Sequence, residues 1–353
     1  MENSKILLFL AFCFFLIAQQ ILSVKSEKHP HRLVPALYIF GSSSVDAGNN
    51  NHLNTVANAN MWPYAIDFNN VRGRYSNGKN LADFAAINLG LPSAPPYLNL
   101  SDSQRSQIAT GINYGSGACG ILNTSRVGDC LWLGQQIKYF TSTVKNDLPK
   151  QMDETKLRNH LAKSMYLLFI GLNDYNPLAN GNITDRYSGP DYADYLLDEI
   201  SKHIQTLYDL GARKFVVQGV SLCKPKQYDQ EKTVKGKVLN CTSRYYRDKL
   251  PAKLSSLEAK LKGSIFTIYD NYMLRYNMQQ NHQKYGITEI EDPCYVSSTN
   301  ELCSDRTKYH FFDKWGHQTE VSCKVAMNGC FNGTICTPYT LFQLANMHIN
   351  HKQ

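Results

Sequence analysis

The feature that most constrains the fold is an apolar run that ends in a small polar turn. Residues 33–40 are apolar throughout, and Gly41-Ser42-Ser43 follows directly. A run of this length predicts a buried strand, and Gly-Ser-Ser predicts a tight turn. We expect the turn to open into a helix capped by Ser42 or Ser43, with Asp46 close to the capping-box position. A serine hydroxyl placed there lies beside backbone N–H groups that favour negative charge on a reacting oxygen.

Strand and helix patterns alternate along the rest of the chain. Strands are predicted at 164–170, 214–218 and 264–269, and helices at 80–89, 191–210, 240–262 and 272–285. This alternation implies right-handed crossovers and a mainly parallel sheet covered by helices on both faces. Sites in such sheets form beyond the carboxyl ends of the strands, where Ser43 and Asn173 are both expected. One α/β domain over residues 27–353 accounts for the pattern.

The first 26 residues have the features of a secretory signal peptide. Lys5 precedes the apolar run Ile6 to Ala18, which is 13 residues long and therefore short for a bilayer span. Cleavage near Ser23 or Ser26 leaves a mature chain that starts near Glu27. We therefore expect a secreted, extracellular protein without stable membrane insertion after signal removal.

The cysteines fit an oxidising compartment. Of 10 cysteines, Cys13 leaves with the signal. Local spacing suggests four disulfides and an unpaired Cys323, the pairs being Cys119 with Cys130, Cys223 with Cys241, Cys294 with Cys303, and Cys330 with Cys336. A metal site is the rival interpretation, but paired C-x-x-C motifs and histidines at ligand spacing are absent from the sequence.

Two further surface properties follow from the sequence. The net charge of +8 is spread along the chain, so a basic surface is favoured over a nucleic-acid site. N-glycosylation is predicted at five sequons, whose asparagines are Asn99, Asn123, Asn182, Asn240 and Asn332.

Three more segments combine a predicted loop with chemically useful side chains. Residues 111–120 contain four glycines, which allow the backbone to approach a ligand closely. A nucleotide-phosphate loop is excluded there because the lysine and Ser/Thr of that motif are missing. Gly171-Leu172-Asn173-Asp174 ends the strand at 164–170, and residues 309–320 contain Asp313 and His317.

Together, these segments resemble the four blocks of the plant GDSL esterases and lipases, a branch of the SGNH hydrolases. Residues 40–50 resemble the block F-G-D-S-x-x-D-x-G-N-N, in which the serine is the nucleophile, so the resemblance implies that role for Ser43. Ser42 replaces the aspartate of that block. Residues 111–120 resemble the second block and residues 171–174 the third. These blocks imply an oxyanion hole made by Ser43, Gly117 and Asn173. The family fold is a flavodoxin-like α/β/α sandwich, and no cofactor or metal is implied.

The last block leaves two alignments open. The family pattern Y-x-F-[FW]-D-x-x-H-x-T-E has one residue fewer between its aspartate and histidine than this sequence has. Aligning from the left makes Asp313 the partner of His317, whereas aligning from the right puts Lys314 in that place. We favour Asp313, because residues four apart can share one face of a turn and a lysine would repel the imidazolium.

The resemblance implies a serine esterase or lipase that hydrolyses or transfers acyl groups through an acyl-enzyme. Ser43, His317 and Asp313 would form its triad, and its substrate would be a lipid, an acetylated polysaccharide or a small ester. The alternative is a catalytically weak or inactive relative that binds a similar ligand, because Ser42 and the Asp313 to His317 spacing depart from the pattern. A structural or adhesive protein would not need four intact blocks.

Overall fold

A parallel sheet built from the predicted apolar strands forms the core of the fold. The computed structural model describes residues 32–175, 189–220 and 238–349, the first five residues of the last range by their backbone only. The strands lie in the order β1, β2, β3, β4, β8, with β8 antiparallel to β4. Their bounds are Leu37–Gly41 for β1, Met165–Phe169 for β2, Lys214–Gly219 for β3, Ile265–Asp270 for β4 and Cys336–Thr337 for β8.

The glycine-rich segment extends this sheet beyond β1. Ile39 N–H donates to the Ile112 carbonyl at 3.2 Å, and Tyr114 N–H donates to the Ile39 carbonyl at 2.8 Å. The segment at 110–116 therefore runs parallel to β1, on the side opposite β2. After β1 the chain first adds the 110–116 segment along one side of that strand, and it later adds β2 along the other side. This reversal creates a switch point at the carboxyl end of β1, the place where doubly wound sheets bind ligands.

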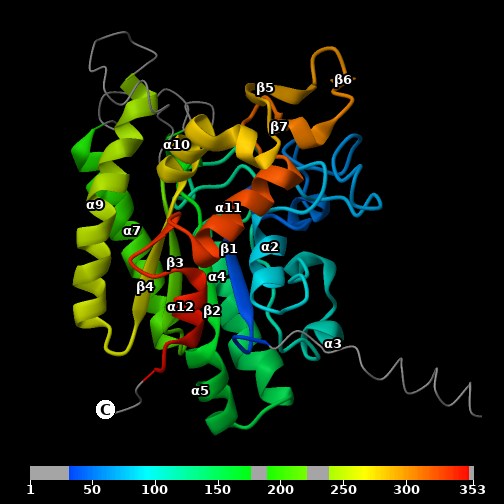
Figure 1. Cartoon of the computed structure of the whole chain (residues 1–353). Coiled ribbons are helices and arrows are strands. Elements are labelled where there is room, and N and C mark those ends of the chain that lie inside the picture. Colours follow the sequence, from blue (N-terminus) through cyan, green and yellow to red (C-terminus); the bar gives the residue numbers. More distant parts are fainter. Residues whose placement is uncertain (1–31, 176–188, 221–237, 350–353) are drawn as a thin grey trace, which may run out of the picture. The chain divides into compact units, whose positions relative to one another are not determined.

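Helices cover both faces of the sheet, as the predicted sandwich requires (Figure 1). One face packs against α4 (Leu133–Ser142), α5 (Glu154–Lys163), α7 (Pro190–Asp209) and α9 (Val238–Lys260). The other packs against α2 (Leu81–Asn88), α10 (Asn271–Asn281), α11 (Glu320–Asn332) and α12 (Leu341–Asn346). Tyr38 and Phe40 of β1 belong to the first core, and Leu37 and Ile39 to the second. This alternation explains why the run is apolar throughout, since a strand covered on both faces has no solvent side.

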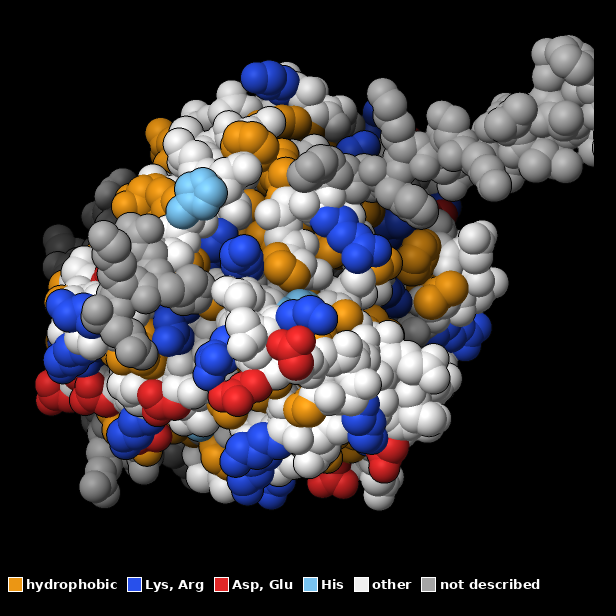
Figure 2. Space-filling model, turned by 90° about the horizontal axis from the view of Figure 1, so that it is seen from below, with side chains coloured by type: hydrophobic (Ala, Val, Ile, Leu, Met, Phe, Trp, Pro, Cys, Tyr) orange, Lys and Arg blue, Asp and Glu red, His pale blue; other side chains and the backbone are white. Residues whose placement is uncertain are grey.

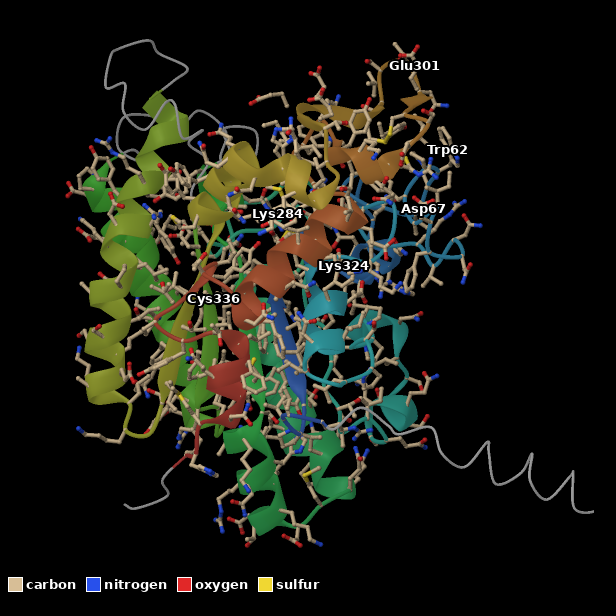
Figure 3. The ribbon with its side chains drawn as sticks, in the orientation of Figure 1. Trp62, Asp67, Lys284, Glu301, Lys324 and Cys336 are labelled. Carbon is tan, nitrogen blue, oxygen red and sulfur yellow. A yellow bond between two sulfur atoms is a disulfide. The ribbon has the colours of Figure 1, made fainter. Side chains whose placement is uncertain are left out.

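A small sheet lies beyond the carboxyl end of the main one. Its strands are β5 (Glu289–Val296), β6 (Glu301–Leu302) and β7 (Tyr309–Asp313), in the order β6, β5, β7. Figure 3 shows Trp62 and Asp67 on the loop beside this sheet, with Glu301 at its outer end. The Arg306 guanidinium joins the two parts through bonds of 2.7 and 2.8 Å to the Asp67 carboxylate.

Short helical segments complete the described chain. They are the α-helix α3 (Asp102–Arg105), the π-helix Thr143–Asp147, and 3₁₀ helices at Asn49–His52, Tyr97–Asn99, Leu148–Lys150, Asn173–Tyr175, His282–Tyr285 and Arg306–Lys308.

Most of the predicted elements agree with the structure to within a few residues. Helix α2 begins after Asn80, whose side chain forms a capping box with Asp83. Helix α7 ends before Gly211, which has a φ of 113°. Three predicted disulfides are present, and Cys323 is a buried free thiol. The pairing of Cys223 with Cys241, the signal peptide at 1–26 and the sequons at Asn182 and Asn240 lie outside the described residues or side chains.

The surface agrees with the spread of charge along the sequence. Figure 2 shows Lys and Arg side chains on one face interspersed with Asp, Glu and apolar side chains. Within the described ranges, no helix combines the length and apolar character needed to cross a bilayer. Asn99, Asn123 and Asn332 are exposed, so these three sequons are accessible to modification.

Candidate active site

The turn after β1 presents Ser43 at the carboxyl edge of the sheet. Ser42 N–H donates to the Phe169 carbonyl at 3.0 Å, which fixes the start of the turn to β2. The Ser42 carbonyl then accepts hydrogen bonds from the N–H groups of Val45 and Asp46. Ser43 is half-buried, and no described residue accepts a hydrogen bond from its own N–H. Both its hydroxyl and its N–H are therefore available to a ligand.

The prediction that this turn opens into a helix capped by Ser42 or Ser43 was wrong. The chain forms a single turn, and a short 3₁₀ helix follows only at Asn49–His52. The Asp46 carboxylate explains the difference, because its Oδ1 accepts from Gly48 N–H and Asn49 N–H, both at 2.8 Å. Asp46 thus binds the backbone where the later segment begins and serves no helix that starts at Ser43. Gly48, with a φ of 129°, also interrupts a regular helix.

Gly117, predicted as an oxyanion donor, has its N–H engaged inside the protein. The Gly117 N–H donates to Asp46 Oδ2 at 2.9 Å. The second block is therefore held against the turn of Ser43 by a buried carboxylate, and the Gly117 N–H is not free to bind an oxyanion. Burial raises the pKa of Asp46 to about 6, although hydrogen bonds from Gly48, Gly117, Asn49 and Asn50 oppose the rise.

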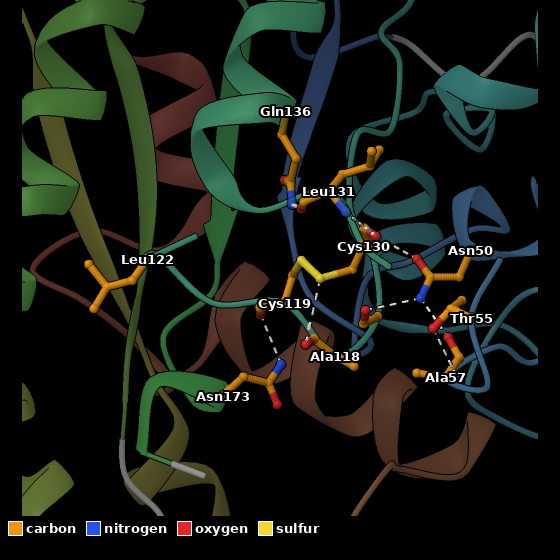
Figure 4. The surroundings of a disulfide bond; sticks show 12 residues. Asn50, Thr55, Ala57, Ala118, Cys119, Leu122, Cys130, Leu131, Gln136 and Asn173 are labelled. Carbon is orange, nitrogen blue, oxygen red and sulfur yellow. Dashed lines mark hydrogen bonds between the residues drawn. A yellow bond between two sulfur atoms is a disulfide. The ribbon is translucent and has the colours of Figure 1, made fainter. Parts of the chain in front are cut away.

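Asn173 follows β2 and reaches the same loop. Figure 4 shows its side chain beside the Cys119–Cys130 disulfide, where Nδ2 donates to the Cys119 carbonyl at 2.9 Å. An amide nitrogen carries two hydrogens, so this bond orients the side chain and leaves one N–H for a second acceptor. The next residue, Asp174, accepts from the N–H groups of Ile121 and Leu122 and so anchors the same loop.

Gln136 is a site residue that the sequence did not reveal. Its buried side chain in α4 accepts from Gly41 N–H at 2.8 Å and donates to the Gly41 carbonyl at 2.9 Å. Figure 4 also shows it beside Leu131, whose carbonyl accepts a third bond at 2.6 Å. The amide thereby pairs with the last residue of β1 and fixes the backbone that leads into Ser43. A single glutamine in an amphipathic helix gives no sequence signal for this role.

Asp313 and His317 form a hydrogen-bonded pair at the end of β7. His317 Nδ1 lies 2.6 Å from Asp313 Oδ2, and the carboxylate is buried. Burial alone would raise the pKa of Asp313, but His317 and hydrogen bonds from His317 and Tyr64 bring it below the ordinary value. An ionised carboxylate only accepts, so Nδ1 carries the proton. Nε2 is then the basic nitrogen of the neutral ring.

The extra residue between Asp313 and His317 is absorbed by a tight turn. Gly316 N–H donates to the Asp313 carbonyl at 3.1 Å, and Gly316 has a φ of 82°, which glycine adopts without strain. Phe312 N–H then donates to the His317 carbonyl at 2.6 Å, so the chain doubles back on β7. Lys314 is exposed on the outside of this turn. The geometry therefore pairs His317 with Asp313 and leaves Lys314 in solvent.

Tyr75 connects the two halves of the site. Its ring lies against the His317 imidazole, with centroids 4.8 Å apart. Its hydroxyl also lies where a side chain on Gly117 would sit, 2.2 Å from an added Cβ. Contacts thus run from the turn of Ser43 through Asp46, Gly117 and Tyr75 to His317. No hydrogen bond joins Ser43 directly to His317 in the part of the chain that the structure describes.

The neighbouring Arg74 has a structural role. Its guanidinium forms bonds of 2.6 and 2.8 Å to the buried carboxylate of Asp83 in α2. This pair ties the loop before Tyr75 to the helix layer.

Comparison with known proteins shows the family of this chain. Residues 37–324 match the model of the family described as GDSL-like lipase/acylhydrolase. The chain belongs to the GDSL lipase/acylhydrolase family. Similar GDSL proteins of Arabidopsis thaliana include GDSL esterase/lipase 7, 33% identical over 96% of this chain and 99% of its own length. Another is GDSL esterase/lipase At5g55050, 32% identical over 89% of this chain and 90% of its own.

Membership of the GDSL family makes the chain a carboxylic-ester hydrolase, the enzyme class predicted from the sequence. The matched range begins at the first residue of β1 and ends within α11. It therefore contains Ser43, Gly117, Asn173, Asp313 and His317, and it includes the strands that position them.

Proposed function

We propose that this GDSL protein cleaves or transfers acyl groups of carboxylic esters with Ser43 as nucleophile, His317 as base and Asp313 as its partner. The observation that carries the proposal is the Asp313 Oδ2 to His317 Nδ1 bond of 2.6 Å. This bond leaves Nε2 as the only basic ring nitrogen, which is the arrangement that a serine hydroxyl needs for activation.

The reaction proceeds in two halves. Ser43 Oγ attacks the ester carbonyl carbon while its proton passes to His317 Nε2. The tetrahedral intermediate then expels the alcohol, which takes that proton. Water then attacks the acyl carbonyl carbon while His317 Nε2 takes its proton. The bond to Ser43 Oγ breaks, that proton returns to Ser43 Oγ, and the acid leaves. Asp313 holds the tautomer and stabilises the imidazolium in both halves.

The oxyanion would be held by the Ser43 N–H and the free amide hydrogen of Asn173. The Ser43 N–H has no partner among the described residues, and Asn173 is oriented by Cys119. We assign Gly117 a supporting role, because its N–H already binds Asp46. The lack of a side chain at Gly117 leaves room for the Tyr75 hydroxyl.

A catalytically weak, ligand-binding relative is the second candidate. The observation in its favour is that no described hydrogen bond joins Ser43 to His317. Catalytic hydrogen bonds are often long before substrate binds, so an active enzyme can also show this separation. The spacing that motivated the alternative is accommodated by the turn at Gly316, which supports the active enzyme.

We also propose that the protein is secreted and glycosylated. Three disulfides support an oxidising compartment, and three of the predicted sequons carry exposed asparagines. The substrate would be an acyl ester of a lipid, an acetylated polysaccharide or a small alcohol.

Covalent labelling with a fluorophosphonate probe tests the proposal without the natural substrate. Labelling of wild type, but not of Ser43→Ala or His317→Ala, is the expected result. If folded wild type stays unlabelled under conditions that label an active serine esterase, the ligand-binding candidate replaces the esterase.

A further inference from the structure

We propose that Tyr64 is a positioning residue for catalysis, which acts by donating a hydrogen bond to the carboxylate of Asp313. The inference rests on the proposed function of Asp313 and His317. Tyr64 lies 249 positions before Asp313, and its hydroxyl donates to Oδ2 at 2.9 Å.

The Asp313 carboxylate is saturated by four donors. Oδ2 accepts from His317 Nδ1 and from Tyr64, while Oδ1 accepts from the backbone N–H groups of Trp315 at 3.0 Å and His317 at 3.3 Å. A carboxylate offers about four lone-pair positions, so each donor restricts rotation of the group. Tyr64 is the only one of these donors, among the described residues, that comes from outside the 313–317 turn.

The Tyr64 hydroxyl is itself held firmly. Its ring packs against Phe312 at 5.5 Å and Tyr75 at 6.0 Å between centroids. The next residue, Ala65, donates its N–H to the Ser76 carbonyl at 2.9 Å. Asp67 binds Arg306 in two places, which ties the loop of Tyr64 to the segment just before β7. The Tyr64 hydroxyl is therefore held in a fixed position relative to β7, the strand that ends at Asp313.

This arrangement gives Tyr64 two effects on the proposed reaction. It prevents the carboxylate from turning away from His317, because Oδ2 is shared between both donors. It also stabilises the charged form of Asp313, since a hydrogen bond to a carboxylate lowers its pKa. Among the described residues, Tyr64 and Tyr75 contact this pair, and burial raises the pKa of both phenols. The carboxylate of Asp46 acts on Tyr75 from the other side, and burial raises the pKa of Asp46 to about 6.

The test compares Tyr64→Phe with Tyr295→Phe in the full-length enzyme. Tyr295 belongs to the same aromatic cluster, but its hydroxyl bonds to Asn300 Oδ1 at 3.2 Å and not to Asp313. Tyr64→Phe is expected to lower kcat about tenfold with KM nearly unchanged, the loss of one transition-state interaction. The acid limb of kcat/KM should move to higher pH, because a carboxylate that loses a hydrogen-bond donor has a higher pKa. Tyr295→Phe should retain the wild-type profile.

A readout independent of turnover uses the proton NMR signal of His317 Nδ1–H, assigned with labelled histidine. We expect Tyr64→Phe to shift this signal and Tyr295→Phe to leave it in place. A purely structural role would lower the unfolding temperature of Tyr64→Phe while its pH profile and NMR signal stayed as in wild type, and that result overturns the proposal. If wild type has no esterase activity but Tyr64→Phe still shifts the His317 Nδ1–H signal, the proposed function is refuted while the contact between Tyr64 and Asp313 is retained.

Discussion

Replacing Gly117 by alanine tests whether the second block shapes the site by leaving space for Tyr75. An added Cβ would lie 2.2 Å from the Tyr75 hydroxyl oxygen, 2.5 Å from Cζ and 2.8 Å from Cε2. Ordinary contacts begin near 3.4 Å, so the ring must retreat by about 1 Å. Retreat is opposed because the Tyr75 hydroxyl donates to the Ala57 carbonyl at 2.5 Å and the ring lies against His317.

The expected cost follows from these contacts. Overpacking of a filled interior costs about 1–3 kcal/mol, and weakening the Tyr75 hydrogen bond adds about 1 kcal/mol. We therefore expect Gly117→Ala to lower the free energy of unfolding by about 2–4 kcal/mol. Displacing the ring onto His317 should also slow fluorophosphonate labelling by up to about 100-fold, the effect of a misplacement of about 1 Å.

Denaturant unfolding and labelling rates measure the two effects. Gly219→Ala is the matched control, since its Cβ would meet the Ile268 side chain no closer than 3.3 Å. Adding Tyr75→Phe to Gly117→Ala should restore part of the stability, because it removes the nearest clashing atom. Wild-type stability and labelling in Gly117→Ala would refute the reasoning.

Three further predictions concern the same site. Asp313→Asn should lower kcat about 10⁴-fold by favouring the wrong His317 tautomer, whereas Lys314→Ala should leave kcat nearly unchanged; equal losses in steady-state assays would contradict the pairing. Asn173→Ala should lower kcat about 10²–10³-fold with KM little affected, and a change confined to KM would exclude its oxyanion role. The raised pKa of Asp46, about 6 against an ordinary 3.8, means that the folded state favours the protonated carboxyl. The Asp46 carboxyl therefore stabilises the folded state below pH 4, and this contribution of about 3 kcal/mol is lost as the pH rises through 6. The free energies of unfolding of wild type and Asp46→Asn should diverge across that window.

The sequence alone determined the parts of this protein that depend on local pattern. Apolar runs long enough to be covered on both faces predicted the strands of the parallel sheet, as at Met165–Phe169. Closely spaced cysteines predicted the three disulfides found among the described residues, because short loops bring such pairs together. The four blocks predicted the family and the candidate residues Ser43, Asn173 and His317. Each of these signals lies within a few neighbouring residues.

Only the tertiary structure decided how the blocks fit together. Asp46 was expected to help cap a helix, but its carboxylate instead binds the N–H of Gly117, 71 positions later. The choice between Asp313 and Lys314 depended on a turn that Gly316 permits. Tyr64 gave no signal at all, since its partner lies 249 positions away and a tyrosine in a loop is common. Such contacts depend on which distant segments the sheet brings together at one edge. Local periodicity in the sequence does not specify which segments these are.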